Sequence, residues 1–526
     1  MHTQKLGVVE NSRHEGSPDV DEKSATINTL HDDTDMHRMG KTQLLKVGRS
    51  FRSIAVLGLT CVVMGTWLGI ITASTFSLIN GGRAGTIWVY VATWLCSMLV
   101  IASLAEMASM SPTSGGQYFW VSEFAPPRAQ KAMSYLSGWL SALGWQAFVA
   151  VAAYQAGNLI LVLATLHSPG YTPERWHGTL ITMAICVLAV LFNAFGAKLL
   201  PRFEGAVLIL HLAGFLAVIV PLWALAPKAS AADVFTKFEN NGGWSSVGAA
   251  CVVGQLSASS AFIGADSAAH MAEEVSDASL TVPRMMMGTI VINGILGLVT
   301  IITFVFSIQD LQTQIVESTS TYPFIDVFRT AVDSDAGAIG MTVPIIVLSI
   351  AMCINAVAAG SRQAWSFARD EGLPFRLWFT KLVTIGGTPL PINSMLASLT
   401  ISVVLSLLIL GGSSAFNSIL GLVTGAVGLT YAVSISCVLW RRLFGEPLPP
   451  ARWSLGRFGV YINAFSVVYQ VFTVIISFFP VDRSVTAETM NWGCAMFGGV
   501  AILSIAWYFI KGRKAYKGPV VYIVKE

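Results

Sequence analysis

The sequence predicts an all-α membrane protein in which twelve transmembrane helices cross the bilayer. Three observations predict this fold class. Hydrophobic residues make up 54% of the 526 residues and charged residues only 12%, a balance typical of bilayer proteins. The apolar residues recur in windows of about 20, the length that crosses a hydrocarbon core. Lys and Arg gather in alternate connections between these windows, as the positive-inside rule requires.

The chain is expected to have three parts. Residues 1–50 hold Asp, Glu, Lys, His and Ser with few apolar runs, and no hydrophobic stretch there is followed by a cleavage site. They predict a disordered cytoplasmic tail and not a secretory signal peptide. Residues 51–512 carry the twelve predicted spans, and residues 513–526 are expected to form a short cytoplasmic tail.

The spans follow the apolar windows in chain order. We place them at about 53–76, 86–110, 131–166, 178–197, 204–225, 244–271, 285–308, 340–367, 393–410, 416–440, 458–479 and 492–510. With both termini inside, most of the basic residues near the membrane lie on the cytoplasmic side, which favours an even number of spans. The basic residues left outside are Arg83, Arg175, Lys228, Lys237, Arg329 and Arg483.

Two of these spans are interrupted by small or polar residues. The sixth contains Gly264 and Asp266 where an unbroken helix would carry Leu or Val, and the first contains Gly65 and Gly69. A carboxyl group deep in the membrane is costly unless it faces a cavity or a partner, so by default it marks a functional site. Because the two spans lie five apart, we predict a five-plus-five inverted repeat with discontinuous helices 1 and 6, followed by two C-terminal helices.

The two interruptions are predicted to form one small-molecule site. In the first, free amides at a helix start would favour a carboxylate, although two glycines four apart also suit close helix packing. In the sixth, freed carbonyls would accept from an ammonium group, and Asp266 would either balance its charge or tie the broken helix to a neighbour. The candidate binding residues are Gly65, Thr66, Trp67, Leu68, Gly69, Phe262, Ile263, Gly264, Ala265 and Asp266.

Aromatic side chains add a second feature to this site. Trp67 and Phe262 could form a cage around a cation by cation–π attraction, with Tyr154 and Trp145 of the third span as further candidates. Since 10% of the residues are aromatic, packing in the core or against lipid is the competing interpretation.

Two titratable side chains are candidates for proton coupling. His211 on the fifth span carries an imidazole, which changes charge near neutral pH, but a lone histidine on an apolar helix is otherwise a packing residue. Glu106, near the inner end of the second span, either takes part in coupling or anchors the loop 115–117. A solvated network at the inner gate is expected from Glu273, Glu274, Asp277 and Arg284. Salt bridges to counterparts on the same side, Arg362, Arg369 and Asp370, are the alternative, with the partners left open.

Several classes of function find no support in the sequence. The net charge of +3 is too small to indicate nucleic acid as a partner. All seven cysteines fall inside apolar segments, which leaves neither a disulfide framework nor a Cys-x-x-Cys metal site. No His-Glu-x-x-His, Gly-x-Ser-x-Gly or Walker-type motif is present, so we predict neither an enzyme nor direct use of ATP. No cofactor is expected beyond a coupling ion, H⁺.

Three regions of the chain resemble a known transporter superfamily. Residues 104–120 resemble the end of the second span and the first cytoplasmic loop of the amino acid, polyamine and organocation transporters, and residues 362–374 resemble their segment after the eighth span. Residues 121–126 and 264–274 are similar to the amino acid and choline branch, which includes fungal GABA and choline permeases. The likeness covers about 46–511. One departure is Trp67, where the amino acid carriers often have a small, glycine-rich break.

The resemblance implies a secondary active transporter, with residues 51–512 as the transporter domain. It would import an amino acid or a small amine such as GABA or choline, coupled to protons, by alternating access. A nutrient sensor with the same fold, or a carrier of another amine, a polyamine or a biosynthetic precursor, is the alternative. The expected partners are this small-molecule substrate and the lipid bilayer. The expected address is the plasma membrane, with the vacuolar membrane as the alternative, and the oligomeric state stays open.

Overall fold

The structure is a computed structural model that describes residues 31–40, 44–45, 53–168, 170–411, 415–487 and 489–519. Most of its regular structure is helical. The helices of the first half are α2 (Ser53–Met64), α3 (Thr66–Thr72), α4 (Ser74–Ile79), α5 (Gly82–Met110), α6 (Gln117–Phe124), α7 (Gln130–His167), α8 (Arg175–Phe195), α9 (Leu200–Leu225), α10 (Ala231–Thr236) and α11 (Val247–Ser260).

The second half continues with one short helix, long helices and a hairpin. Its helices are α12 (Ser267–His270), α13 (Ala278–Ser307), α14 (Phe324–Val332), α15 (Asp335–Arg369), α16 (Arg376–Phe379), α17 (Ile392–Ser406), α18 (Ala415–Phe444), α19 (Gly459–Ile476), α20 (Gly493–Trp507) and α21 (Arg513–Ala515). Short 3-10 or π turns occupy Ala272–Glu274, Gln312–Val316, Leu407–Gly411, Gly456–Phe458 and Tyr508–Gly512.

Two antiparallel strand pairs lie outside the helices. Strand β1 (Asn80–Gly81) pairs with β2 (Glu239–Asn240), and β3 (Val383–Ile385) pairs with β4 (Thr388–Leu390), with Val383 opposite Leu390. The turn of the second pair consists of Gly386 and Gly387, both at positive φ, which is the conformation that a two-residue hairpin turn requires. The sequence analysis had not predicted either pair.

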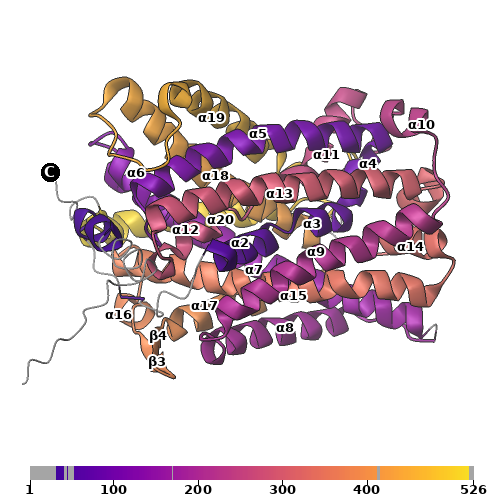
Figure 1. Cartoon of the computed structure of the whole chain (residues 1–526), viewed down its shortest axis with the longest axis horizontal. Helices are drawn as coiled ribbons and strands as arrows, with labels where there is room; N and C mark the ends of the chain where they lie inside the picture. The colour runs from indigo at the N-terminus through magenta and orange to yellow at the C-terminus, as the bar shows by residue number, and fades with distance from the viewer. Residues whose placement is uncertain are drawn as a thin grey trace, which may run out of the picture.

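The long helices run side by side as one bundle (Figure 1). Helices α6, α12 and α16 and the β3–β4 hairpin lie at one end of the bundle, and α10 and α14 lie at the opposite end. Among the described residues, eleven helices are long and apolar enough to cross a membrane. The sixth predicted span, 244–271, is not one of them, because it divides into α11, of 14 residues, and the short helix α12.

Helix starts follow the local polar residues. Ser246 and Ser334 accept hydrogen bonds from the amides of Ala249 and Gly337, at 3.1 and 3.2 Å, and so cap α11 and α15. Helix α13 starts at Ala278, seven residues before the predicted 285, and Pro283 lies in its second turn. Helix α15 starts at Asp335, ahead of the predicted 340.

Helix α9 directs two titratable side chains to the inside of the bundle and large apolar side chains to the outside. On α9, Glu204 and His211 are fully buried, whereas Ile209 and Leu216 are 71% and 54% exposed. This polarity is expected of a helix whose outer face meets lipid, because every buried polar group needs a partner within the protein. It places the titratable side chains of α9 against α2, α13 and α15.

The N-terminal 50 residues are largely outside the described part of the chain. Residues 31–38 are helical, and the side chains of Met36 and Met39 are buried against the bundle. The predicted disorder of residues 1–50 therefore does not describe this short segment.

Candidate functional site

The first predicted span breaks at Gly65, between α2 and α3. Gly65 has a φ of 46°, in the left-handed region that glycine adopts without strain. The amide N–H of Thr66 no longer bonds within the helix and donates to Oδ1 of Asn293 at 3.2 Å. Asn293, on α13, donates in turn to the carbonyl of Cys61 at 3.3 Å. A side chain of a neighbouring helix thus satisfies backbone groups on both sides of the break.

The second break covers residues 261–266, between α11 and α12. Gly264 has a φ of 109° and lies directly against the end of α2. A Cβ atom at this position would stand 2.7 Å from Cγ1 of Val63 and 3.4 Å from the amide nitrogen of Met64. Only glycine fits here, because both the backbone conformation and the space exclude a side chain.

The two breaks touch each other. The Thr66 hydroxyl donates to the carbonyl of Ala261 at 2.8 Å, which bonds the start of α3 to the segment that follows α11. Helix α3 also packs against α11, and α12 packs against α2. The four half-helices therefore meet where both helices lose their regular hydrogen bonds, inside the bundle.

The side chains predicted to form an aromatic cage lie apart from one another, against different helices. Phe262 is buried and contacts the ring of Tyr90 at 5.3 Å between centroids. Trp67 is also buried, but its ring lies against α9, with centroids 5.9 Å from His211 and 6.2 Å from Phe215. Tyr154 stacks on Phe416 of α18 at 5.5 Å.

Asp266 is held by side chains from two other helices. The Tyr431 hydroxyl of α18 donates to Oδ1 at 2.5 Å, and Nε2 of Gln117, at the start of α6, donates to Oδ2 at 2.7 Å. The carboxyl group has no exposed surface. Of the two predicted roles for Asp266, this geometry favours the acceptor that ties the broken helix to its neighbours.

The two candidates for proton coupling lie on different helices and have different neighbours. His211 is buried on α9 beside Trp67, close to the first break. Glu106 forms an ion pair with Arg442 and accepts from Ser454 Oγ and the Leu455 amide, both at 2.9 Å. These partners belong to the end of α18 and the connection to α19. The alternative role for Glu106 as an anchor of the loop 115–117 is therefore wrong, since its partners lie elsewhere.

Glu273 and Glu274 of the predicted inner network are buried and form salt bridges, so they are not solvated, whereas Arg284 is exposed. Glu274 pairs with Arg362 at 2.9 Å, and both side chains are at most 2% exposed. Glu273 pairs with Arg369 at 2.8 Å. Burial is tolerated because each charge has an opposite partner within hydrogen-bonding distance.

Two buried titratable residues were missed by the sequence analysis. Glu204 accepts from Nδ2 of Asn355 at 2.9 Å and packs against Gly58 of α2. His270 lies 3.5 Å from Asp266. The spacing of Asp266 and His270, four residues apart, and the carboxyl group at the start of the fifth span were the available signals.

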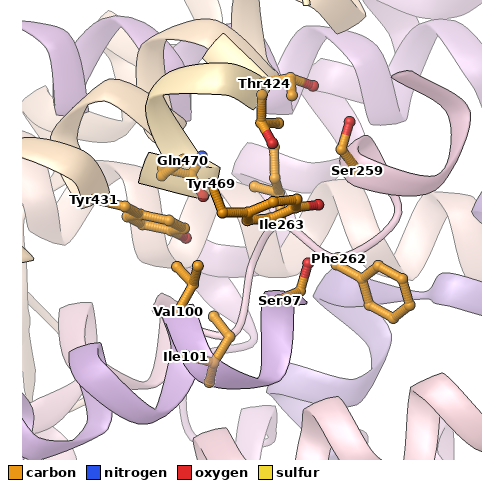
Figure 2. A pocket seen from close by; sticks show the side chains of 11 residues that line it. Ser97, Val100, Ile101, Ser259, Phe262, Ile263, Thr424, Tyr431, Tyr469 and Gln470 are labelled. Carbon is orange, nitrogen blue, oxygen red and sulfur yellow. The ribbon is translucent and has the colours of Figure 1, made fainter. Parts of the chain in front are cut away.

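A small cavity lies beside the second break. Its volume is about 20 Å³, enough for about one water molecule but too small for an amino acid or amine. Phe262 and Ile263 line it together with Tyr431 and Tyr469, and Figure 2 shows these side chains around the cavity. Residues 65–69 and Tyr154 do not line it. Because residues 65–68 and 261–266 are all buried, the predicted site at the two breaks is closed in this conformation.

A bundle of membrane-length helices, with two interrupted helices in contact at its centre, defines the class of multi-pass membrane transporters. Comparison with known proteins identifies the family. The profile of the amino acid permease family matches residues 54–501, and the chain belongs to this family, within the superfamily of amino acid, polyamine and organocation transporters. The chain is accordingly a transporter and not an enzyme.

Relatives among characterised and putative transporters cover most of the chain. A putative amino acid/polyamine transporter of Macrophomina phaseolina is 30% identical over 84% of this chain and 97% of its own length. A choline transporter of Saccharomyces cerevisiae is 29% identical over 89% of this chain and 82% of its own. A crystal structure of an Eremococcus coleocola manganese transporter matches the fold with a TM-score of 0.55, at 14% identity, over 88% and 95% of the two chains.

Proposed function

We propose that the protein is a secondary active transporter that imports an amino acid or a small amine such as GABA or choline together with protons. Its cycle would be one of alternating access, and its twelve spans would comprise two inverted repeats of five and two further helices. The contact between the two breaks, through Thr66 and Ala261, is the observation that carries this proposal. Unwound segments that meet inside a bundle present free backbone groups to a polar solute without exposing them to lipid.

The proposed substrate site lies between residues 65–69 and 262–266. Carbonyl groups of the second break would accept from an ammonium group, and amides near the first would donate to a carboxylate. Phe262 supplies an apolar wall next to the break. Because Trp67 and Tyr154 contact other helices in this conformation, a cage that includes them requires a rearrangement when the site opens.

The closed site supports alternating access. The cavity of about 20 Å³ excludes every solute of the proposed class, so loading requires part of the bundle to move. The half-helices beside the breaks are the natural moving parts, since each is joined to its other half by a flexible glycine. The buried pairs Glu274–Arg362 and Glu273–Arg369 would hold the inner end closed.

The choline transporter among the relatives favours an amine as the substrate. The putative amino acid/polyamine transporter is the reason to include polyamines among the candidate substrates. A nutrient sensor of the same fold, or a carrier of a polyamine or a biosynthetic precursor, is the alternative. We propose the plasma membrane as the cellular location of the protein.

The test is solute accumulation by the purified protein in proteoliposomes. We expect an inward proton gradient to concentrate at least one of radiolabelled choline, GABA, putrescine and a neutral α-amino acid above its external level. Competition among the four then identifies the class of substrate. Binding of a solute without its transport would favour a sensor. A level of accumulation that changes neither with the proton gradient nor on addition of a protonophore would exclude proton coupling.

A further inference from the structure

Asp266 and His270 form a pair at the inner side of the second break. His270 is the last residue of α12, and its Nε2 lies 3.5 Å from Oδ2 of Asp266. Both side chains are completely buried. The other polar contacts of Asp266, from Tyr431 and Gln117, are both donors, so the carboxyl oxygens act as acceptors, as an ionised carboxylate does.

The contacts of the His270 ring show which of its nitrogen atoms carries a hydrogen. Nδ1 lies 3.0 Å from the carbonyl oxygen of Ser114, in the loop before α6. A carbonyl oxygen only accepts, so Nδ1 carries a hydrogen. Trp145 meets the ring edge-on, with centroids 5.2 Å apart, and Gly116 lies so close that a Cβ there would stand 2.8 Å from Cε1. The packing keeps the ring in this orientation.

In this closed conformation, a neutral His270 would leave the buried Asp266 carboxylate without a positive charge beside it. With the hydrogen on Nδ1, a neutral ring would place the lone pair of Nε2, which has no hydrogen-bond partner among the described residues, 3.5 Å from the Asp266 carboxylate, and would leave that negative charge buried without a cation. A second hydrogen, on Nε2, turns the ring into an imidazolium and makes the pair electrically neutral. Neutral pairs are what the interior of a membrane protein tolerates.

No other described cation is available to neutralise Asp266. Among the elements that pack against α12, the cations of α15, Arg362 and Arg369, pair with the neighbouring glutamates. Arg284 of α13 is exposed. Helix α2 contributes the Cys61 thiol, which bonds to Thr289 of α13, and α18 contributes the Tyr431 hydroxyl that already donates to Asp266.

We infer that Asp266 and His270 together hold the proton that is carried with the substrate. This inference rests on the proposed function, to which it adds the site of the coupling proton. In loading, a proton from water bonds to Nε2 of His270, and in release it returns to water, so that the pair alternates between neutral and singly negative. Tyr431 connects the pair to the small cavity, which has room for about one water molecule. The inference places the proton on a residue other than His211 or Glu106.

The first test observes the proton without any substrate. Protein labelled with ¹⁵N-histidine, in lipid bilayers, is studied by solid-state NMR, and the resonances of His270 are assigned by their loss in His270→Gln. We expect both ring nitrogens of His270 to carry hydrogen, and Nε2 to lose it in Asp266→Asn. A bare Nε2 in the unmodified protein overturns the inference. Because no solute is needed, this outcome is separate from failure of the proposed function.

The second test measures coupling in proteoliposomes, with choline and GABA as probes. In His270→Gln we expect gradient-driven accumulation to fall to the equilibrium level, while exchange of internal for external probe continues, because exchange needs no net proton movement. His167→Gln is the matched control at an exposed histidine and should behave as the unmodified protein. Retained accumulation in His270→Gln, or loss of coupling in His211→Gln alone, contradicts the inference.

Discussion

Glu204 brings a carboxyl group into the bundle with one neutral hydrogen-bond partner, Asn355. Replacing it with Ala removes the acceptor of the Asn355 amide and leaves a cavity, and an unsatisfied buried donor costs about 1–3 kcal/mol. We expect Glu204→Ala to lower the melting temperature of the purified protein, whereas Glu204→Gln, which keeps an acceptor, should change it much less. Equal melting temperatures for both variants would show that this bond contributes little.

Asp266 is the buried carboxylate that the proposed substrate site and the proposed proton site share. In Asp266→Asn, one of the two donors, Gln117 or Tyr431, faces an amide N–H in place of an oxygen. Loss of a hydrogen bond to a charged group is worth about 1.5–3 kcal/mol, so uptake should fall by more than about tenfold. The measurement is radiolabelled uptake in cells, with surface expression checked by biotinylation.

Asp333→Asn is the control, because Asp333 is exposed and Asn also adopts its left-handed conformation. Normal uptake kinetics would remove Asp266 from the site.

At the level of the helices, the close contact of the two breaks depends on glycine. A side chain at Gly264 would meet Val63 and force the second break away from the end of α2. We expect Gly264→Val to abolish uptake of a transported probe while the protein still reaches the membrane. Gly340→Ala is the control, since a Cβ at Gly340 meets no atom within 4 Å and alanine favours the helix. Uptake by Gly264→Val near the normal rate would mean that the breaks need not touch.

The sequence predicted the elements better than their contacts. Long apolar windows predicted the spans, and Gly65 and Gly264 predicted both breaks, because these signals are local. The partners of Asp266 and His270 were beyond such reasoning, since Tyr431 and Ser114 lie more than 150 residues away in the chain. The same holds for Trp67, whose ring turns towards α9, and for Tyr154. A contact between distant helices follows from packing, which a single sequence does not display.

At the scale of the whole molecule, the N-terminal segment 31–40 closes the bundle end that carries α12. Asp32 accepts from the amides of Asp277 and Ala278, at 3.0 and 2.9 Å, and so caps α13. Arg38 pairs with Glu123 of α6 at 3.1 Å. The segment therefore joins α6 to α13, two elements that border the second break.

The docking of this segment is expected to depend on pH through Asp35. Burial raises the pKa of Asp35 above its ordinary value of 3.8, against smaller lowering effects of a Ser279 hydrogen bond and Arg38. The docked state thus holds this proton more tightly than the free segment, so the contribution of Asp35 to docking is complete below pH 3.8 and is lost as the pH rises through the raised pKa. Hydrogen exchange of residues 31–40, corrected for the intrinsic rate, should slow on mild acidification, and Asp35→Asn should remove this dependence. Protection that is independent of pH in the unmodified protein would contradict the assignment.

The central claim is that a small solute binds where the two interrupted helices meet. The most direct measurement is a cryo-EM structure of the protein in lipid nanodiscs with the solute that proteoliposomes accumulate. We predict density for that solute between residues 65–69 and 262–266, in contact with backbone groups of both breaks. Density confined to another place, such as an enlarged cavity lined by Tyr469 and Gln470, with both breaks still closed on each other, would contradict the claim.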